Sequence, residues 1–93
     1  MKPCVVIPVF NHASTVMTVA AAARQHLPVI VADDGSTDSP PYPADLEVVR
    51  LGRNQGKGAA LRAGFQRAVE LGYTHAITMD ADGQHYAEDL PKF

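Results

Sequence analysis

Two carboxylates stand one residue apart directly after an apolar run near the end of the sequence. The run covers residues 76–79, and Asp80, Asp82 and the amide of Gln84 follow it. Hard divalent ions prefer oxygen ligands, and Mg²⁺ usually takes one or two protein carboxylates while water and substrate phosphate fill its other positions. The spacing therefore predicts a metal site at Asp80, Asp82 and Gln84. An ordinary turn is the alternative, since Asp and Gly are common turn residues after a strand.

A second acidic cluster repeats this order of apolar run, acid and glycine. Residues 29–32 form an apolar run too short for a helix, and Asp33, Asp34 and Gly35 come directly after it. A turn is again the alternative here. If both runs are parallel strands, their carboxyl ends meet at one edge of the sheet, which is where open α/β folds bind ligands. We therefore expect Asp34 and Asp82 to lie at the same edge.

Lys57 is a cationic candidate for the same site. It stands at the amino end of a predicted helix, where free N–H groups already favour an anion. A lysine opposes the helix dipole at this position, so helix stability does not explain its placement. A phosphate or acidic partner is one interpretation, and a solvated surface lysine is the other.

Spacing excludes two familiar nucleotide-binding motifs. Residues 52–58 resemble a P-loop, but three residues separate Gly52 from Gly56 where the motif has four, and Gly58 replaces its Ser or Thr. The dinucleotide fingerprint fails because Leu61 occupies its last glycine position and no glycine-rich turn follows the first predicted strand.

The elements that would position these residues alternate between strand and helix. Apolar runs predict strands at residues 4–7, 29–32, 46–50 and 76–79. Helical spacing predicts one helix from Ser14 or Thr15 to about residue 25, and a second from residue 56 to about residue 71. Pro8 is expected to close the first strand, and Gly72 to end the second helix. This alternation is typical of an α/β fold with a mostly parallel sheet and flanking helices.

Each predicted helix has an apolar face. On the first helix this face holds Val16, Val19, Ala20 and Ala23. On the second helix the residues that recur at helical spacing are Leu61, Phe65, Ala68 and Val69. Small residues at positions 59, 60 and 64 would allow this helix to approach the sheet closely.

Size, charge and cysteine content limit the function classes. The chain has 93 residues, of which 46% are hydrophobic and 19% charged, as expected of a single small globular domain. The formal net charge is −2 and there is no basic stripe, so nucleic acid is not an expected partner. Cys4 is the only cysteine, which excludes an internal disulfide and is typical of a reducing, cytoplasmic compartment. The first apolar run is too short for a signal peptide or a membrane span.

Four segments in order resemble the successive signatures of family 2 glycosyltransferases. They are IPVFN at residues 7–11, VADDGSTD at 31–38, NQGKGAALRAG at 54–64 and MDADGQH at 79–85. The resemblance is strongest to the branch of dolichyl-phosphate mannose synthases and polyprenyl-phosphate glycosyltransferases, which carries a D-A-D-x-Q-H run. It covers nearly the whole chain and is far more specific than any one of the motifs.

The resemblance implies a GT-A fold, of which residues 1–93 would be the Rossmann-like, nucleotide-binding half. It also implies a UDP- or GDP-linked sugar donor, a divalent metal, Mg²⁺ or Mn²⁺, and transfer of a hexose to a polyprenyl phosphate or polysaccharide, at the cytoplasmic face of a membrane. The residues that it assigns to the donor are Pro8, Phe10, Asn11, Asp33, Asp34, Gly35, Lys57 and Asp80. Those that it assigns to the metal are Asp80, Asp82 and Gln84.

Three departures from the family pattern bear on what the chain does alone. His12 stands where the family often has an acid, and it receives no role. The proline-rich residues 39–43 replace a helix, so this connection is short. In the family, the acceptor-binding half and the catalytic base lie beyond the metal motif. We therefore expect this chain to be the N-terminal part of a longer protein, holding the donor half-site without turning over by itself.

Two other function classes stay open. One is a non-catalytic binding or assembly module of the same fold, in which an exposed sheet edge would favour self-association into a homo-oligomer. The other is a nucleotidyltransferase, which also holds metal and nucleotide with spaced acids. A preference for a free nucleoside triphosphate over a nucleotide sugar distinguishes the latter.

Overall fold

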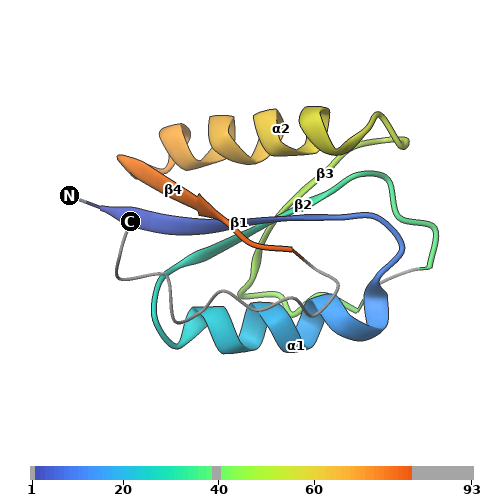
Figure 1. The fold of residues 1–93 in the computed structure, drawn as a ribbon, viewed down its shortest axis with the longest axis horizontal. Helices are drawn as coiled ribbons and strands as arrows, with labels where there is room; N and C mark the ends of the chain where they lie inside the picture. Colours follow the sequence, from blue (N-terminus) through green and yellow to red (C-terminus); the bar gives the residue numbers. More distant parts are fainter. Residues whose placement is uncertain (1, 39–40, 81–93) are drawn as a thin grey trace.

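The computed structural model describes residues 2–38 and 41–80. Within these ranges the elements follow in the order β1 (Pro3–Val9), α1 (Ala13–Arg24), β2 (Val29–Asp33), β3 (Glu47–Arg50), α2 (Lys57–Glu70) and β4 (His75–Thr78). The strands form one parallel sheet with the order β3-β2-β1-β4 (Figure 1). The predicted α/β class with a mostly parallel sheet is confirmed.

The strand order places a topological switch point between β1 and β4. The chain moves from β1 to β2 and β3 on one side, and α2 then returns it across the sheet to β4 on the other side of β1. The helices cover opposite faces of the sheet, α1 on one face and α2 on the other (Figure 1). In open sheets of this kind, the usual ligand site is the crevice beyond the carboxyl ends of the strands at the switch point.

The strand β1, one of the two inner strands of the sheet, is apolar on both faces because a helix covers each face. Val5, Ile7 and Val9 belong to the core cluster on the α1 side. Cys4 and Val6 belong to the cluster on the α2 side. This two-sided burial explains why the sequence shows a continuous apolar run here instead of an alternation of apolar and polar residues.

The first strand is longer than predicted. The expectation that Pro8 closes it is wrong, since β1 continues through Pro8 to Val9. Backbone hydrogen bonds alternate along β1, with odd-numbered residues facing β2 and even-numbered residues facing β4. Pro8 therefore faces the β4 side, where the paired register already ends at Val6 and Thr78. The missing N–H of the proline removes no ladder hydrogen bond at that position.

The first helix begins earlier than predicted. Its N-cap is His12, so the expectation of Ser14 or Thr15 is wrong, and no side chain of the cap residue makes a capping hydrogen bond. Instead the carboxylate of Asp38 accepts a hydrogen bond from the main-chain N–H of Ala13 at 2.9 Å. A residue from the β2–β3 connection thus satisfies a free N–H group at the start of α1. Local sequence could not reveal a cap that comes from a distant part of the chain.

The second helix approaches the sheet through small residues, as predicted for positions 60 and 64, but it leaves two of the larger residues on its predicted inward face exposed. Its buried residues are Ala60, Gly64 and Ala68, whereas Phe65 is 38% exposed and Val69 is 73% exposed. The expectation that Phe65 and Val69 belong to the inward face is therefore wrong. The helix lies so close to the sheet that only small side chains fit between them. The predicted inward residues of the first helix are all buried: Val16, Val19, Ala20 and Ala23.

Gly64 determines how closely α2 approaches the sheet. A Cβ atom added there would lie 2.5 Å from Cγ1 of Val6 and 3.4 Å from Cβ of Ala32. We expect Gly64→Ala to lower the free energy of unfolding by about 1–3 kcal/mol, because overpacking outweighs the higher helix propensity of alanine. Urea unfolding measures this change.

Gly58→Ala is the matched control in the same helix. The nearest atom to a Cβ added there is Nη1 of Arg62 at 3.6 Å, which is an ordinary contact. We expect this substitution to raise the free energy of unfolding by about 0.5 kcal/mol, because alanine loses less backbone freedom than glycine on folding. Equal effects of the two substitutions would contradict the close packing at Gly64.

Candidate functional site

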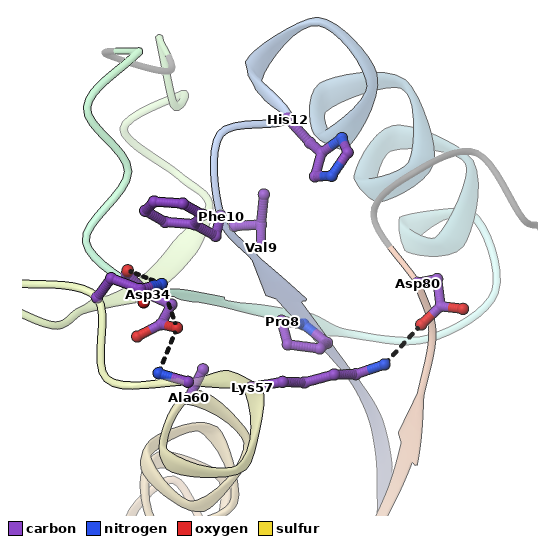
Figure 2. A pocket seen from close by; sticks show the side chains of 10 residues that line it. Pro8, Val9, Phe10, His12, Asp34, Lys57, Ala60 and Asp80 are labelled. Carbon is purple, nitrogen blue, oxygen red and sulfur yellow. Dashed lines mark hydrogen bonds and ion pairs between the residues drawn. The ribbon is translucent and has the colours of Figure 1, made fainter.

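A cavity of about 410 Å³ opens at the carboxyl ends of β1, β2 and β4 (Figure 2). It lies at the switch point of the sheet, where ligands are expected. Ten residues from four segments of the chain line it: Pro8, Val9, Phe10, His12, Asp34, Asn54, Gly56, Lys57, Ala60 and Asp80.

The fold brings together most of the predicted donor residues that the structure describes. Those that line the cavity are Pro8, Phe10, Asp34, Lys57 and Asp80. Asn11, Asp33 and Gly35 are adjacent in the chain to lining residues but are not part of the lining. The predicted metal ligands Asp82 and Gln84 lie outside the described residues, so the expected approach of Asp82 to Asp34 stays a prediction.

The Asp34 carboxylate holds the loop that precedes α2. It is 3% exposed. It accepts three hydrogen bonds from this loop, given by the main-chain N–H groups of Gln55 at 2.7 Å and Gly56 at 2.9 Å and by the side-chain amide of Asn54 at 2.9 Å. These bonds to a charged acceptor compensate for its burial. Asp34 thereby determines where α2 and its first residue, Lys57, begin.

Asp33 binds residues of the β2–β3 connection through its carboxylate. Its side chain is fully buried, and its carboxylate accepts hydrogen bonds from the main-chain N–H of Ser36 at 2.7 Å and from the hydroxyl of Tyr42 at 2.6 Å. Nε of Arg50 lies 3.9 Å from the same carboxylate. Burial, together with the hydrogen bond to Asp33, raises the pKa of Tyr42 well above its ordinary value, so this hydroxyl remains a donor. Tyr42 is thereby tied to the buried end of β2.

Asn11 joins the β1–α1 turn to the β2–β3 connection. Its φ angle of 56° lies in the left-handed region, which Asn adopts more readily than most residues. Its main-chain N–H donates to Oγ of Ser36 at 2.9 Å, and its side-chain oxygen accepts from the main-chain N–H of Thr37 at 2.8 Å. These bonds hold Phe10 and His12, the residues on either side of Asn11, beside the cavity.

Lys57 and Asp80 approach each other along one side of the cavity (Figure 2). Nζ of Lys57 lies 3.2 Å from Oδ1 of Asp80, and the two side chains are 65% and 40% exposed. An ion pair this exposed contributes only about 0–1 kcal/mol to stability. Both side chains are therefore accessible to a ligand that offers either of them a stronger partner.

Five of the lining residues had no predicted site role: Val9, His12, Asn54, Gly56 and Ala60. Asn54 and Gly56 fall inside residues 54–64, the third segment that resembles the family. Their place in this segment could have indicated that they belong to the site. His12 had no such signal, because it departs from the family pattern. Its ring points into the cavity from the start of α1, on the other side from Lys57 (Figure 2).

Among the described residues, Asp80 is the best candidate to hold a divalent cation. The Asp34 oxygens already accept three hydrogen bonds, whereas the Asp80 carboxylate is partly exposed at the cavity and pairs only with Lys57 in the bonds that the structure shows. Within residues 2–38 and 41–80, no group of three or more His, Cys, Asp or Glu side chains could hold a metal. One carboxylate completed by substrate phosphate and water fits the ligand set that Mg²⁺ usually takes. The described residues thus fit a metal that binds together with its substrate.

Comparison with known proteins places the chain in a family. Residues 4–93 match the sequence profile described as Glycosyl transferase family 2. The chain therefore belongs to glycosyl transferase family 2, as the four motifs predicted.

Two curated relatives illustrate the branch of the family. The chain is 32% identical over 103 aligned positions to the undecaprenyl-phosphate mannosyltransferase of Micrococcus luteus, a match that covers 99% of this chain and 42% of that protein. It is 31% identical to the polyprenol monophosphomannose synthase of Mycolicibacterium smegmatis, with 98% of this chain and 39% of that protein covered. The chain thus spans less than half the length of each of these relatives.

A solved structure supports the fold. The crystal structure of S. aureus TarS residues 1–349 superposes with a TM-score of 0.55 at 20% sequence identity, covering 99% of this chain and 31% of that chain. At this identity the match shows the fold alone, and it confirms the predicted GT-A class. None of the helices in the part of the chain that the structure describes has the length and apolar character needed to cross a membrane.

Proposed function

We propose that this chain is the donor-binding part of a metal-dependent glycosyltransferase, and that its cavity binds the nucleoside diphosphate of a UDP- or GDP-linked sugar. The observation that carries the proposal is the meeting of Phe10, Lys57 and Asp80 at the switch point of the sheet. An aromatic ring, a cation and an accessible carboxylate are the groups that a base, a diphosphate and a metal would require. Membership of glycosyl transferase family 2 supports the same class of ligand.

The cavity presents different chemistry to the two ends of such a ligand. Phe10 is 40% exposed, lines the cavity and offers an aromatic ring against which a base can stack. Lys57 lies at the first turn of α2, where its ammonium group and the free N–H groups of the helix both attract a diphosphate. Asp34 contributes by holding the preceding loop, so the start of α2 is already in place before the ligand arrives.

The metal, Mg²⁺ or Mn²⁺, would be held by Asp80 together with Asp82 and Gln84. When bound, it would supply positive charge that stabilises the nucleoside diphosphate as a leaving group. Lys57 would add a second positive charge beside the same diphosphate. For the whole protein we propose a polyprenyl-phosphate acceptor, which the names of the two relatives support. We propose that the transfer takes place at the cytoplasmic face of a membrane.

Calorimetric titration of UDP- and GDP-sugars, with and without Mn²⁺, tests this proposal. We expect metal-dependent binding of a nucleotide sugar. Asp80→Asn should weaken that binding by about tenfold, which corresponds to about 1.4 kcal/mol, because it removes a metal-binding charge while preserving size.

Asp45→Asn is the matched control, since Asp45 is a 74% exposed acid that pairs with Arg24 and does not line the cavity. We expect it to leave the affinity unchanged. A folded sample that binds no nucleotide sugar in the presence of metal would refute the proposal. Binding of a free nucleoside triphosphate in preference to every nucleotide sugar would support a nucleotidyltransferase instead.

A further inference from the structure

The ion pair between Lys57 and Asp80 occupies both groups that the proposed ligands need. We propose that this pair, called the latch below, couples the two ligands: a diphosphate draws Lys57 away and thereby frees Asp80 for the metal. This inference rests on the proposed function and adds to it a reason why metal and nucleotide would bind as a unit.

The latch restricts what Asp80 offers to a cation before the nucleotide arrives. Nζ of Lys57 lies 3.2 Å from Oδ1 of Asp80, within direct ion-pair distance. A divalent cation at the same carboxylate would experience repulsion from the ammonium group. A metal alone must therefore displace Lys57 or bind beside it, and either way its affinity is reduced.

The latch can open without rearrangement of the fold. Both side chains are substantially exposed, 65% for Lys57 and 40% for Asp80, so neither is held in place by packing. The main chain at the start of α2 is held by the hydrogen bonds from Gln55 and Gly56 to Asp34, so opening requires only rotation of the long Lys57 side chain. This motion is small compared with the closure of a loop or domain.

The cavity offers Lys57 no second carboxylate of comparable accessibility among its described lining residues. The other acid of that lining is Asp34, which is 3% exposed and already accepts three hydrogen bonds. A ligand phosphate is thus the natural alternative partner for the ammonium group. Because phosphate takes Lys57 and metal takes Asp80, each ligand removes the competitor of the other. Such coupling is reciprocal by thermodynamic necessity.

The test compares Lys57→Met with the wild-type full chain in two separate titrations. Mn²⁺ alone is followed by electron paramagnetic resonance of the free ion, and UDP or GDP without metal is followed by calorimetry. We expect Lys57→Met to bind Mn²⁺ about two- to fivefold more tightly, the range that an exposed ion pair supports. We expect the same variant to bind the nucleoside diphosphate about fivefold more weakly, because it loses a charge-assisted contact. The two affinities thus change in opposite directions.

Arg62→Met is the control for net charge, because Arg62 lies on α2 but does not line the cavity. We expect both of its affinities to stay close to those of the wild type. A Mn²⁺ affinity that is unchanged or lower in Lys57→Met would overturn the latch even if nucleotide binding falls. An equal gain in Arg62→Met would overturn it too, since the gain would then be a general effect of charge.

The two proposals fail in distinguishable ways. If the wild type binds neither UDP nor GDP, with or without metal, the proposed function fails, while the comparison with Mn²⁺ alone still shows whether Lys57 competes for Asp80. If metal-dependent nucleotide binding occurs but the Mn²⁺ affinity of Lys57→Met does not rise, the latch fails and the proposed function stands. Absence of Mn²⁺ binding in all variants overturns the latch.

Discussion

Replacing Gly35 with alanine is expected to lower the free energy of unfolding by about 3 kcal/mol. Gly35 has a φ angle of 76°, a conformation that side chains other than glycine rarely adopt. An added Cβ atom would lie 2.4 Å from the carbonyl carbon of Arg53 and 2.6 Å from the main-chain nitrogen of Asn54. Because both are backbone atoms, no side-chain rotation can relieve the contact, and the end of β2 must separate from the loop before α2.

Gly52→Ala is the matched control in that same loop. A Cβ atom added at Gly52 meets nothing within 4 Å, so we expect its effect on stability to stay within about 0.5 kcal/mol. Cys4 supplies the measurement, since it is the only cysteine and is fully buried, and burial raises the pKa of its thiol. The thiol should react with a thiol reagent only as the chain unfolds in urea. Equal stability of the two variants would show that the loops do not pack as closely as the structure indicates.

The second large effect is expected for Asp34→Asn. The substitution keeps the size of the side chain but replaces one acceptor oxygen with an NH₂ group, which faces donors from Asn54, Gln55 and Gly56. At least one donor in this part-buried region then loses its partner, and the remaining hydrogen bonds lose their charged acceptor. We expect the free energy of unfolding to fall by about 3 kcal/mol. Urea unfolding measures the loss, and hydrogen exchange at the amides of Gln55 and Gly56 locates it.

Asp80→Asn makes the same chemical change at a carboxylate that carries no such network. Its side chain is 40% exposed and its observed partner is Lys57, so we expect a change in stability within about 0.5 kcal/mol. The two substitutions separate two roles: Asp34 would act on ligand binding by holding the start of α2, and Asp80 by direct contact. If Asp34→Asn were no less stable than Asp80→Asn, the structural role of Asp34 would be wrong.

The comparison of Asp33 with Asp34 shows how far adjacent residues can differ once the chain folds. The resemblance to the family assigned both residues to the donor site. Both are aspartates at the end of the same apolar run, so the sequence does not distinguish their roles. In the structure Asp33 bonds to Ser36 and Tyr42, whereas Asp34 bonds to the loop before α2 and lines the cavity. The donor role of either residue stays a prediction, and the titrations above test it for the cavity as a whole.

The sequence by itself determined the α/β class, the order of the elements and the family. Local pattern is enough for these because apolar runs and helical spacing reflect burial on the faces of single elements, and because the four motifs lie within short segments. It also placed the candidate residues at strand ends, and a parallel sheet brings such ends to one edge.

Only the tertiary structure decided which side chains line the cavity, which support it and where some elements begin. Asp38 caps α1 from a distant loop, and Asp34 finds its partners about twenty residues downstream. Phe65 and Val69 lie exposed where periodicity placed them on the inward face. The physical reason is that hydrogen-bond partners and packing distances are set between elements. A propensity or a spacing along one segment contains no information about the segment that will lie against it.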